Sequence, residues 1–423
     1  MTMMRRCDGC LPPYGDRDRS TEMSAEPFGS GLAAQLARWV PEWVRHQCAQ
    51  SVIDHGLHKH HRRPDMNRKT GMNAGQILGT IDGLQVVGLD IAKQVFQMHT
   101  VDMVTGEIVN VQIKRAKVLE HFANRAPCLV GIEACGGAHH WARELSALGH
   151  TVRLLHAKAV RPFVSGNKTD AADARAIWLA VQQPGTKCVG VKALAQQATL
   201  TLHRQRELLM KMRTMQTNAL RGLLYEFGAV FAKGTRVMLG EVEAALESLS
   251  NKLPQMVADS LREQVQRIKT LGEDIAAIDK RLALQLRQDA DMQRIAEIPG
   301  VGVLTATAAI ATMGDPRAFR SAREFCAWLG LVPKQWGTGG KVRLQGISKR
   351  GDSYLRTLLI HGARSVLSHA KEPGPWLEQI QARRPANVVI VAQAAKMARA
   401  IWAVTAKQQE YHRGYRSVRP QAA

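Results

Sequence analysis

Five short apolar runs between Gln85 and His156 constrain the fold of this chain more than any other feature. Three follow one another closely, "QVVGLDIA", "VFQMHTVD" and "EIVNVQIK", and turn-type residues separate them, as between β-strands. The fourth, "CLVGIEA", and the fifth, "HTVRLLH", flank a stretch whose apolar residues recur at helical spacing, and residues 169–181 show the same spacing. Strands that alternate with helices predict an α/β domain over residues 85–188.

The next part of the chain is expected to be helical. Residues 189–288 carry almost no strand signal, and their apolar side chains recur at intervals of three or four, which predicts long helices. Towards the end of this region the interval is almost that of a heptad repeat, so we expect two helices to pair in a coiled coil that serves as a linker or a dimerisation arm. The repeat consists of Leu261, Val265, Ile268, Leu271, Ile275, Ile278 and Leu282.

A second compact, mainly helical domain is expected over residues 295–404, followed by a polar tail at 405–423. The expected fold class is therefore α/β plus all-α. Residues 1–72 are rich in Arg, His, Pro and Gly without sustained periodicity, and we interpret them as a basic, disordered extension. Met72 stands just before the ordered pattern, which favours a translation start near that residue.

The seven cysteines are odd in number and scattered, so we expect free thiols and no disulfide framework. Cys7 and Cys10 form one C-x-x-C pair, but a structural zinc ion needs four ligands. The nearby residues that could complete such a set are Cys48 and the histidines from His55 onward, and we do not expect zinc there.

The charge of the chain predicts a polyanionic partner. Lys and Arg number 58 against 36 Asp and Glu, which gives a net charge of +22 and favours nucleic acid over an anionic membrane surface. A generally basic, soluble surface is the alternative. The chain has no run of eighteen apolar residues and its N-terminus lacks the apolar core of a signal peptide, so we expect a cytoplasmic, DNA-associated protein with no membrane segment.

Four acidic residues stand where carboxylates are unusual. Asp90 and Glu133 end the first and fourth apolar runs, where a buried strand accepts an acid only near its end or beside a counter-charge. Asp170 and Asp173 are three apart at the start of a helix, and therefore share one face. Hard oxygen ligands of this kind suit Mg²⁺, and two such ions support phosphoryl transfer. Helix capping is the alternative for Asp170 and Asp173, but it explains neither Asp90 nor Glu133.

Six segments resemble the insertion-sequence family 110 transposases, also called DEDD transposases or bridge-RNA recombinases. They are "VVGLDIAKQVFQ", "GIEACGGAHHWARELSALGH", "NKTDAADARAIW", "EIPGVG", "LGLVPKQWGTGGKVRLQGISKRGDSYLRTLLIHGAR" and "NVVIVAQAAKMARAIWAV". The resemblance extends from about Gln85 to Val404. It implies a RuvC-like domain of ribonuclease H fold at the N-terminal side, with Asp90, Glu133, Asp170 and Asp173 on the four acidic positions of the family, and a C-terminal transposase domain of the insertion-sequence 116/110/902 type.

The resemblance also implies a serine that attacks the DNA phosphate and becomes linked to it. In the family this serine lies just before a glycine pair, where this chain has Thr338. Threonine also carries a hydroxyl, although its branched Cβ crowds the attack. We therefore expect Thr338 to be the nucleophile, with Ser348 as the alternative and an inactive copy as a further one.

The surroundings of Thr338 predict a nucleic-acid-binding surface. Glycines and basic residues from residue 334 to residue 356 suggest a flexible, basic loop that approaches a phosphate backbone closely. Its basic members are Lys334, Lys341, Arg343, Lys349, Arg350 and Arg356. Upstream, Gly300 and Gly302 form a turn before a helix, where backbone N–H groups either bind a phosphate or make an ordinary packing corner between helices. His139, His140 and His361 are interpreted as packing residues rather than metal ligands.

These observations predict a Mg²⁺-dependent transposase that cuts and rejoins DNA through a covalent intermediate. The resemblance further implies a structured guide RNA transcribed from the element, and strand exchange requires a dimer or a tetramer. Two alternatives remain open, a RuvC-type structure-specific endonuclease that uses water, and a catalytically inactive nucleic-acid-binding copy.

Overall fold

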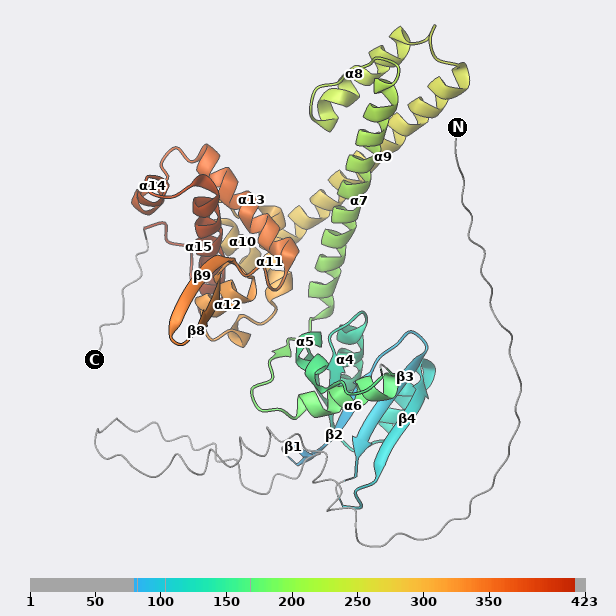
Figure 1. Ribbon diagram of the computed structural model, residues 1–423, viewed down its shortest axis with the longest axis vertical. Coiled ribbons are helices and arrows are strands. Elements are labelled where there is room, and N and C mark those ends of the chain that lie inside the picture. The colour runs from blue at the N-terminus through green and yellow to red at the C-terminus, as the bar shows by residue number, and fades with distance from the viewer. Residues whose placement is uncertain (1–79, 82, 103, 168, 415–423) are drawn as a thin grey trace, which may run out of the picture. The chain divides into compact units, whose positions relative to one another are not determined.

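The computed structural model describes residues 80–414 except residues 82, 103 and 168. The extension at 1–72, Met72 and the cysteines and histidines considered as zinc ligands lie outside the described residues, as do residues 415–423 of the polar tail. Figure 1 shows the described elements in order along the chain.

The first part of the chain forms a mixed sheet, and the five expected strands are all present. Counting two short additional strands, the sheet has the order β4-β3-β2-β5-β6-β7, with β1 paired to β2. Strands β2, β3 and β4 form an antiparallel meander, whereas β5 and β6 run parallel to β2. The strands are β1 (Thr80–Ile81), β2 (Leu84–Asp90), β3 (Val95–Val101), β4 (Ile108–Lys114), β5 (Leu129–Glu133), β6 (Thr151–Leu155) and β7 (Cys188–Val189).

Helices cover both faces of this sheet. Phe96 and Ile132 belong to a buried cluster with Phe122 and Trp141 of the helices on one face. Val86 belongs to a second cluster, with Ile177 of the helix on the other face. The covering helices are α3 (Val118–Ala123), α4 (Ala138–Ala147), α5 (Ala157–Val160) and α6 (Asp170–Val181). The near-continuous apolar sequence of β2 and β5 follows from burial on both faces, and the layout agrees with the ribonuclease H fold that the resemblance implies.

Two long helices follow, with a shorter one between them, as the spacing predicts. They are α7 (Leu194–Tyr225), α8 (Thr235–Ser248) and α9 (Gln255–Gln288). Thr199 near the start of α7 donates a hydrogen bond to Gln285 near the end of α9, whereas Gln264 of α9 donates to Gln216 farther along α7. The two helices are therefore antiparallel, and they run side by side in Figure 1. The heptad residues of α9 pack within this chain.

The remaining described residues form a helical bundle with one buried core, and a two-stranded sheet lies between its third and fourth helices in the chain. Phe325, Leu355, Leu359, Met397 and Ile401 lie in that core and come from three of its helices. The helices are α10 (Ala290–Ala296), α11 (Val303–Met313), α12 (Ala322–Trp328), α13 (Ser353–His369), α14 (Pro375–Gln381) and α15 (Ala386–Lys407). The expected class of α/β followed by all-α is therefore confirmed.

Helix α15 alone among the described helices is long and apolar enough to cross a membrane by length and composition. Its apolar residues Ala394, Met397 and Ile401 are buried in the core of the bundle. Burial in this core accounts for the apolar sequence of α15. The described cysteines, Cys128, Cys135, Cys188 and Cys326, are free thiols, as expected.

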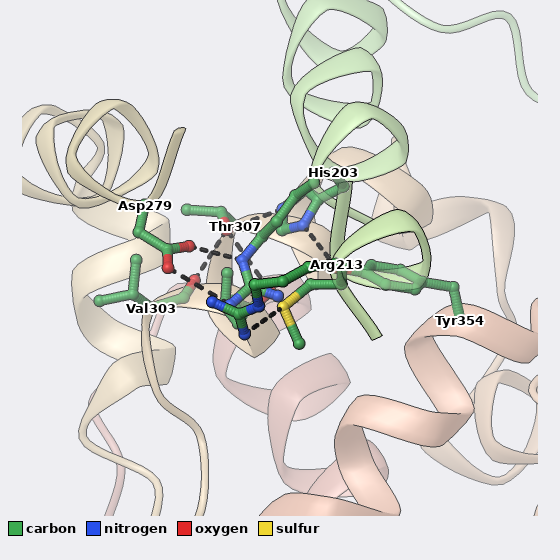
Figure 2. Close-up of polar contacts among 9 residues, drawn as sticks. His203, Arg213, Asp279, Val303, Thr307 and Tyr354 are labelled. Carbon is green, nitrogen blue, oxygen red and sulfur yellow. Dashed lines mark hydrogen bonds and ion pairs between the residues drawn. The ribbon is translucent and has the colours of Figure 1, made fainter. Parts of the chain in front are cut away.

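A buried polar chain joins α7 to the bundle, as Figure 2 shows. The Thr307 hydroxyl donates to the carbonyl oxygen of Val303 at 2.7 Å, so His203 Nε2, 3.0 Å from Thr307 Oγ1, must carry the proton. His203 Nδ1 is then free to accept from the Tyr354 hydroxyl at 3.0 Å. Burial, aided by Arg206, lowers the pKa of His203 to about 4 and keeps the imidazole neutral.

Candidate active site

Asp90 and Glu133 lie beside each other at one edge of the sheet. Strands β2 and β5 are parallel neighbours in which Leu89 pairs with Ile132, and each acid is the next residue along its strand. Both strands end there, so the carboxylates leave the buried sheet together, and both side chains are half-buried. The sequence pattern placed each acid at a strand end, and the parallel pairing brings the two ends together.

Helix α6 crosses the same face of the sheet at unusually short range. A Cβ atom at Gly88 would lie 2.6 Å from the Trp178 amide nitrogen and closer still to the Ala174 carbonyl oxygen. Gly131 pairs with Gly88 across the two strands, and a Cβ atom added at Gly131 would lie 3.0 Å from the Val181 Cβ. The indole Nε1 of Trp178 donates to the Val86 carbonyl oxygen at 3.1 Å and fastens the helix to β2. Two glycines therefore set the height of α6 above the sheet.

The close approach of α6 brings its first turn, with Asp170 and Asp173, towards Asp90. The N-cap of this helix is Thr169, whose hydroxyl accepts a hydrogen bond from the Ala172 amide at 3.2 Å. A side-chain cap is therefore already supplied by a neutral residue. Capping, the alternative for the two acids, does not require either of them.

The pKa of Asp90 indicates that the other three acids lie close enough to repel its charge. Its pKa rises from the ordinary 3.8 to about 6, first because burial disfavours the charged carboxylate. Repulsion from Asp173, Asp170 and Glu133 adds to the shift, in that order. A site that crowds carboxylates in this way favours a cation among them.

The donor set fits a hard divalent cation. All four side chains offer carboxylate oxygens, which Mg²⁺ prefers. A bound cation would relieve the repulsion that, after burial, raises the pKa of Asp90. Among the described residues, no three His, Cys, Asp or Glu side chains are already arranged to hold a metal ion. The acids therefore converge on one edge without forming a closed ligand cage.

The segment around Thr338 is a β-hairpin, not the flexible loop that its glycines suggested. Strands β8 (Pro333–Thr338) and β9 (Lys341–Ile347) pair antiparallel, with Thr338 opposite Lys341. Gly339 and Gly340 form the two-residue turn, with φ angles of +56° and +78° that favour glycine. The expectation of a loop was wrong because a glycine pair between two strand-forming runs is itself a hairpin signal.

Thr338 is exposed at the end of β8, beside the turn. Lys334, Lys341 and Arg343 are exposed on the same hairpin. Ser348 follows β9, and its hydroxyl oxygen is buried, with no hydrogen-bond partner within the described part of the chain. Of the two candidate nucleophiles, Thr338 is the one whose hydroxyl faces solvent.

The basic residues after the hairpin differ in what they contact. Lys349 and Arg350 are exposed. Arg356 is half-buried, and its Nη1 donates to the carbonyl oxygens of Leu329 at 2.9 Å and Arg350 at 2.8 Å. Arg356 therefore braces the base of the hairpin, and the nucleic-acid contact expected of it stays a prediction.

Gly300 and Gly302 also differ from each other. Gly300 has φ +88°, and a Cβ atom there would lie 2.8 Å from the carbonyl oxygen of Gly362 on α13. This close approach favours the packing corner for Gly300. Gly302 is exposed at the N-cap of α11 and stays a candidate for phosphate binding.

Comparison with known proteins identifies the family to which the chain belongs. A model described as "Transposase IS116/IS110/IS902 family" matches residues 292–377, and a DEDD transposase model of the IS110 type matches residues 87–228. A "Probable family 20 transposase" of Pseudomonas aeruginosa is 45% identical over 336 residues, which cover 78% of this chain and 99% of that protein. This chain belongs to the IS116/IS110/IS902 transposase family.

Two further transposases are similar over nearly the same extent. The transposase for insertion sequence element IS1111A of Coxiella burnetii is 37% identical over 78% of this chain and 92% of its own length. The transposase for IS1328 of Yersinia enterocolitica is 36% identical over 76% of this chain and 96% of its own length. The resemblance read from the sequence motifs is confirmed, and the protein is an insertion-sequence transposase, a DNA-processing enzyme.

The two family models divide the transposase between its two candidate sites. The match at 87–228 contains all four acids and the whole of α6. The match at 292–377 contains the hairpin with Thr338. Sequence reasoning missed Gly88 and Gly131, although small residues within apolar strands are the available signal for a close helix. It also missed Trp336, which stands alone among polar and glycine residues.

The histidines near these sites have contacts that suit packing. His139 Nδ1 accepts a hydrogen bond from the Lys192 amide at 3.2 Å, just before α7 begins. His140 lies 3.5 Å from Glu144 on the same helix. Burial, with Lys192 and two arginines nearby, lowers the pKa of His139 to about 4, so it is neutral at physiological pH.

We expect Asp90→Asn to stabilise the metal-free transposase at neutral pH. Because the folded-state pKa of Asp90 is raised from 3.8 to about 6, its contribution to stability is fully present below 3.8 and is lost as the pH rises through 6. Asparagine does not ionise and so avoids that loss. We expect it to raise the free energy of unfolding at neutral pH by about 1 kcal/mol, a figure that allows for the partial exposure of Asp90. Thermal unfolding in a chelator at pH 5 and pH 7.5 measures the difference, with the exposed Asp274→Asn as control. A variant less stable than wild type at pH 7.5 would contradict the expectation.

Proposed function

We propose that this transposase cuts and rejoins DNA with a Mg²⁺-dependent carboxylate site and a threonine nucleophile, and that a structured RNA guides it. The observation that carries the proposal is the convergence of four carboxylates on one edge of the sheet, where burial first and then repulsion from the other three acids raise the pKa of Asp90. Burying like charges together is costly unless a cation or a proton joins them. Asp90, Glu133, Asp170 and Asp173 are the residues that would hold the metal.

Bound Mg²⁺ would neutralise charge on the phosphate oxygens and orient the phosphodiester. Thr338 has a different task. Its hydroxyl oxygen forms a bond to phosphorus as the bond to the leaving oxygen of the DNA strand breaks. The hydroxyl proton passes to solvent, and the leaving oxygen takes up a proton from solvent to become a DNA hydroxyl. The resulting threonine–DNA ester keeps the energy of the phosphodiester, so attack by a second DNA hydroxyl rejoins the strand and restores Thr338.

The exposure of Thr338 and of its basic neighbours supports this role. Lys341 lies directly opposite Thr338 across the hairpin, where its ammonium group faces the same side of the ribbon. A positive charge in that position attracts a phosphate to the hydroxyl. Lys334 and Arg343 extend the positive charge along both strands.

The overall charge supports contact with more than one nucleic acid. A net charge of +22 suits a protein that binds phosphate backbones by shape and leaves sequence choice to base pairing with an RNA. The guide RNA is part of the proposal through the resemblance alone. We further propose a dimer or tetramer, because strand exchange needs more than one active site.

A stripe on α7 supports self-association. Leu208, Met212, Met215 and Leu223 are exposed apolar residues at intervals close to helical turns. The buried heptad residues of α9 already pack within this chain. A second copy would therefore use the exposed stripe of α7 and leave the α9 seam intact.

Covalent trapping tests the proposed mechanism. End-labelled element-junction DNA is incubated with the full chain, Mg²⁺ and the RNA transcribed from the noncoding flank of the element, and is then resolved on a denaturing gel. We expect label that migrates with protein, no such label in a chelator, and a DNA-bound peptide that maps to Thr338. Clean nicks without an adduct would indicate a water-using endonuclease, and binding without either product would indicate an inactive copy.

Thr338→Ser separates Thr338 from Ser348. Serine keeps the hydroxyl and removes the branching methyl group, so we expect the adduct to form at least as fast as in wild type, by up to about tenfold. Ser348→Ala is the matched control and should leave the rate of adduct formation unchanged. An adduct lost in Ser348→Ala and retained in Thr338→Ala would assign the attack to Ser348.

A further inference from the structure

The β8–β9 hairpin has two chemically different faces. Residues paired across an antiparallel ribbon lie on the same face, and the face alternates at every residue. Trp336 pairs with Arg343, and Thr338 pairs with Lys341, so these four side chains share one face. Val342 and Leu344, one residue removed in register, lie on the opposite face. One face is therefore aromatic, basic and hydroxyl-bearing, whereas the other carries Val342 and Leu344 with the uncharged Gln335.

Trp336 is exposed on this hairpin in a way that the other tryptophans of the bundle are not. Its exposed fraction is 62%, and it takes part in no ring or cation–π contact within residues 80–414 as described. Trp328, by contrast, stacks on Phe325, and Trp376 lies under the Lys396 ammonium group at 4.4 Å. A large indole on a β-ribbon that is left open to water is suited to bind a planar apolar surface.

The charge around Trp336 selects the kind of surface. Residues 333–347 contain three basic residues and no acid, so the hairpin attracts an anionic polymer and not a neutral apolar partner. A nucleic-acid strand with an unpaired base offers both phosphates and an open aromatic face. A base within a duplex is covered on both faces by its neighbours, whereas a strand that is being exchanged exposes its bases.

From these observations we infer that Trp336 is a base-stacking residue that holds an unpaired DNA base beside the phosphate at Thr338. Trp336 and Thr338 are two residues apart on one face, or about 7 Å along the strand, so a base stacked on Trp336 lies close to a phosphate held at Thr338. Arg343, opposite Trp336, contacts the neighbouring phosphate. The position of the base next to the scissile phosphate depends on the proposed role of Thr338, but the stacking itself does not.

The first test measures binding of the full chain to a short single-stranded DNA of mixed sequence in a chelator, where no cleavage takes place. Excess unlabelled abasic strand occupies surfaces that bind phosphates alone. We expect Trp336→Ala to weaken binding about 5- to 100-fold and Trp336→Phe to retain most of it. Leu344→Ala, with a side chain 66% exposed on the opposite face, is the matched control and should bind as wild type does.

An abasic probe separates stacking from charge. On a labelled abasic strand, Trp336→Ala should bind as wild type does, whereas Arg343→Gln should weaken binding to both the normal and the abasic strand. Equal binding of wild type and Trp336→Ala to the normal strand would overturn the inference. An equal loss on both strands would also overturn it, because it would mean that the hairpin had lost its structure and not a base contact.

Photocrosslinking supplies a readout that needs no substitution. A strand that carries 5-iodouracil in place of thymine is bound to the wild-type chain in a chelator, irradiated and digested, and the crosslinked peptide is sequenced. We expect the crosslink at Trp336, and a crosslink placed entirely on other residues would overturn the inference. The binding measurements and the photocrosslinking do not depend on the covalent trapping experiment. Their results could therefore be interpreted even if Thr338 were not the nucleophile.

Discussion

Asp90→Asn is expected to reduce DNA cleavage by the transposase at least about a hundredfold. Replacing a residue that only orients a metal ligand already costs up to about a hundredfold in activity, and Asp90 is proposed to bind the metal itself. Asparagine keeps the size of the side chain at the end of β2 but removes the charge that the other three acids oppose. It would therefore weaken metal binding without disturbing the strand. Cleavage of labelled element DNA at saturating Mg²⁺, together with a Mg²⁺ titration, measures both effects.

DNA binding by Asp90→Asn should be unchanged or slightly tighter, because a negative charge has been removed from a surface that faces phosphates. Asp274→Asn, an exposed acid of α9, is the control and should cleave at the wild-type rate. The same variant is expected to be the more stable protein in a chelator, since the pKa of Asp90 is raised in the folded state. A variant that is stabilised but inactive is the signature of a functional acid, whereas an Asp90→Asn variant with wild-type cleavage would rule out the carboxylate site.

Gly88→Val is expected to destabilise the α/β domain by about 3 kcal/mol or more and to abolish cleavage. Its Cβ would overlap the Ala174 carbonyl oxygen and the Trp178 amide nitrogen, which are backbone atoms of α6 and cannot rotate away. Helix α6 must then lift from the sheet, and it carries Asp170 and Asp173 with it. The Trp178 hydrogen bond to Val86 would also lengthen.

Scanning calorimetry and the cleavage assay measure the two consequences of Gly88→Val. Gly190→Ala is the control, because no atom lies within 4 Å of the Cβ it would add and its φ is not in the left-handed region. We expect that control to match wild type in both assays. Wild-type cleavage by Gly88→Val would show that the height of α6 above the sheet does not position the acids.

Parts of the fold and site follow from local patterns in the sequence. Hydrophobic periodicity is enough to predict a strand or a helix in much of the chain. It does so for the five strand runs, the helix at 170–181 and the long helices of the middle region. The acids could be singled out for a similar reason, because Asp90 and Glu133 interrupt apolar runs at their ends. The hairpin was misread because glycine serves both loops and tight turns, and only the pairing of β8 with β9 distinguishes them.

The sequence by itself determined most of the elements, their order and the positions of the four acids at strand ends and at a helix start, because hydrophobic periodicity and strand-end charges are local properties of the chain. Only the tertiary structure decided which of these residues meet. The parallel pairing of β2 with β5 places Asp90 beside Glu133, and the glycines at 88 and 131 let α6 bring two more acids to the same edge. The hairpin register likewise puts Trp336, Arg343 and Thr338 on one face. Contacts between residues far apart in the chain depend on pairing and packing distances, which no local pattern encodes.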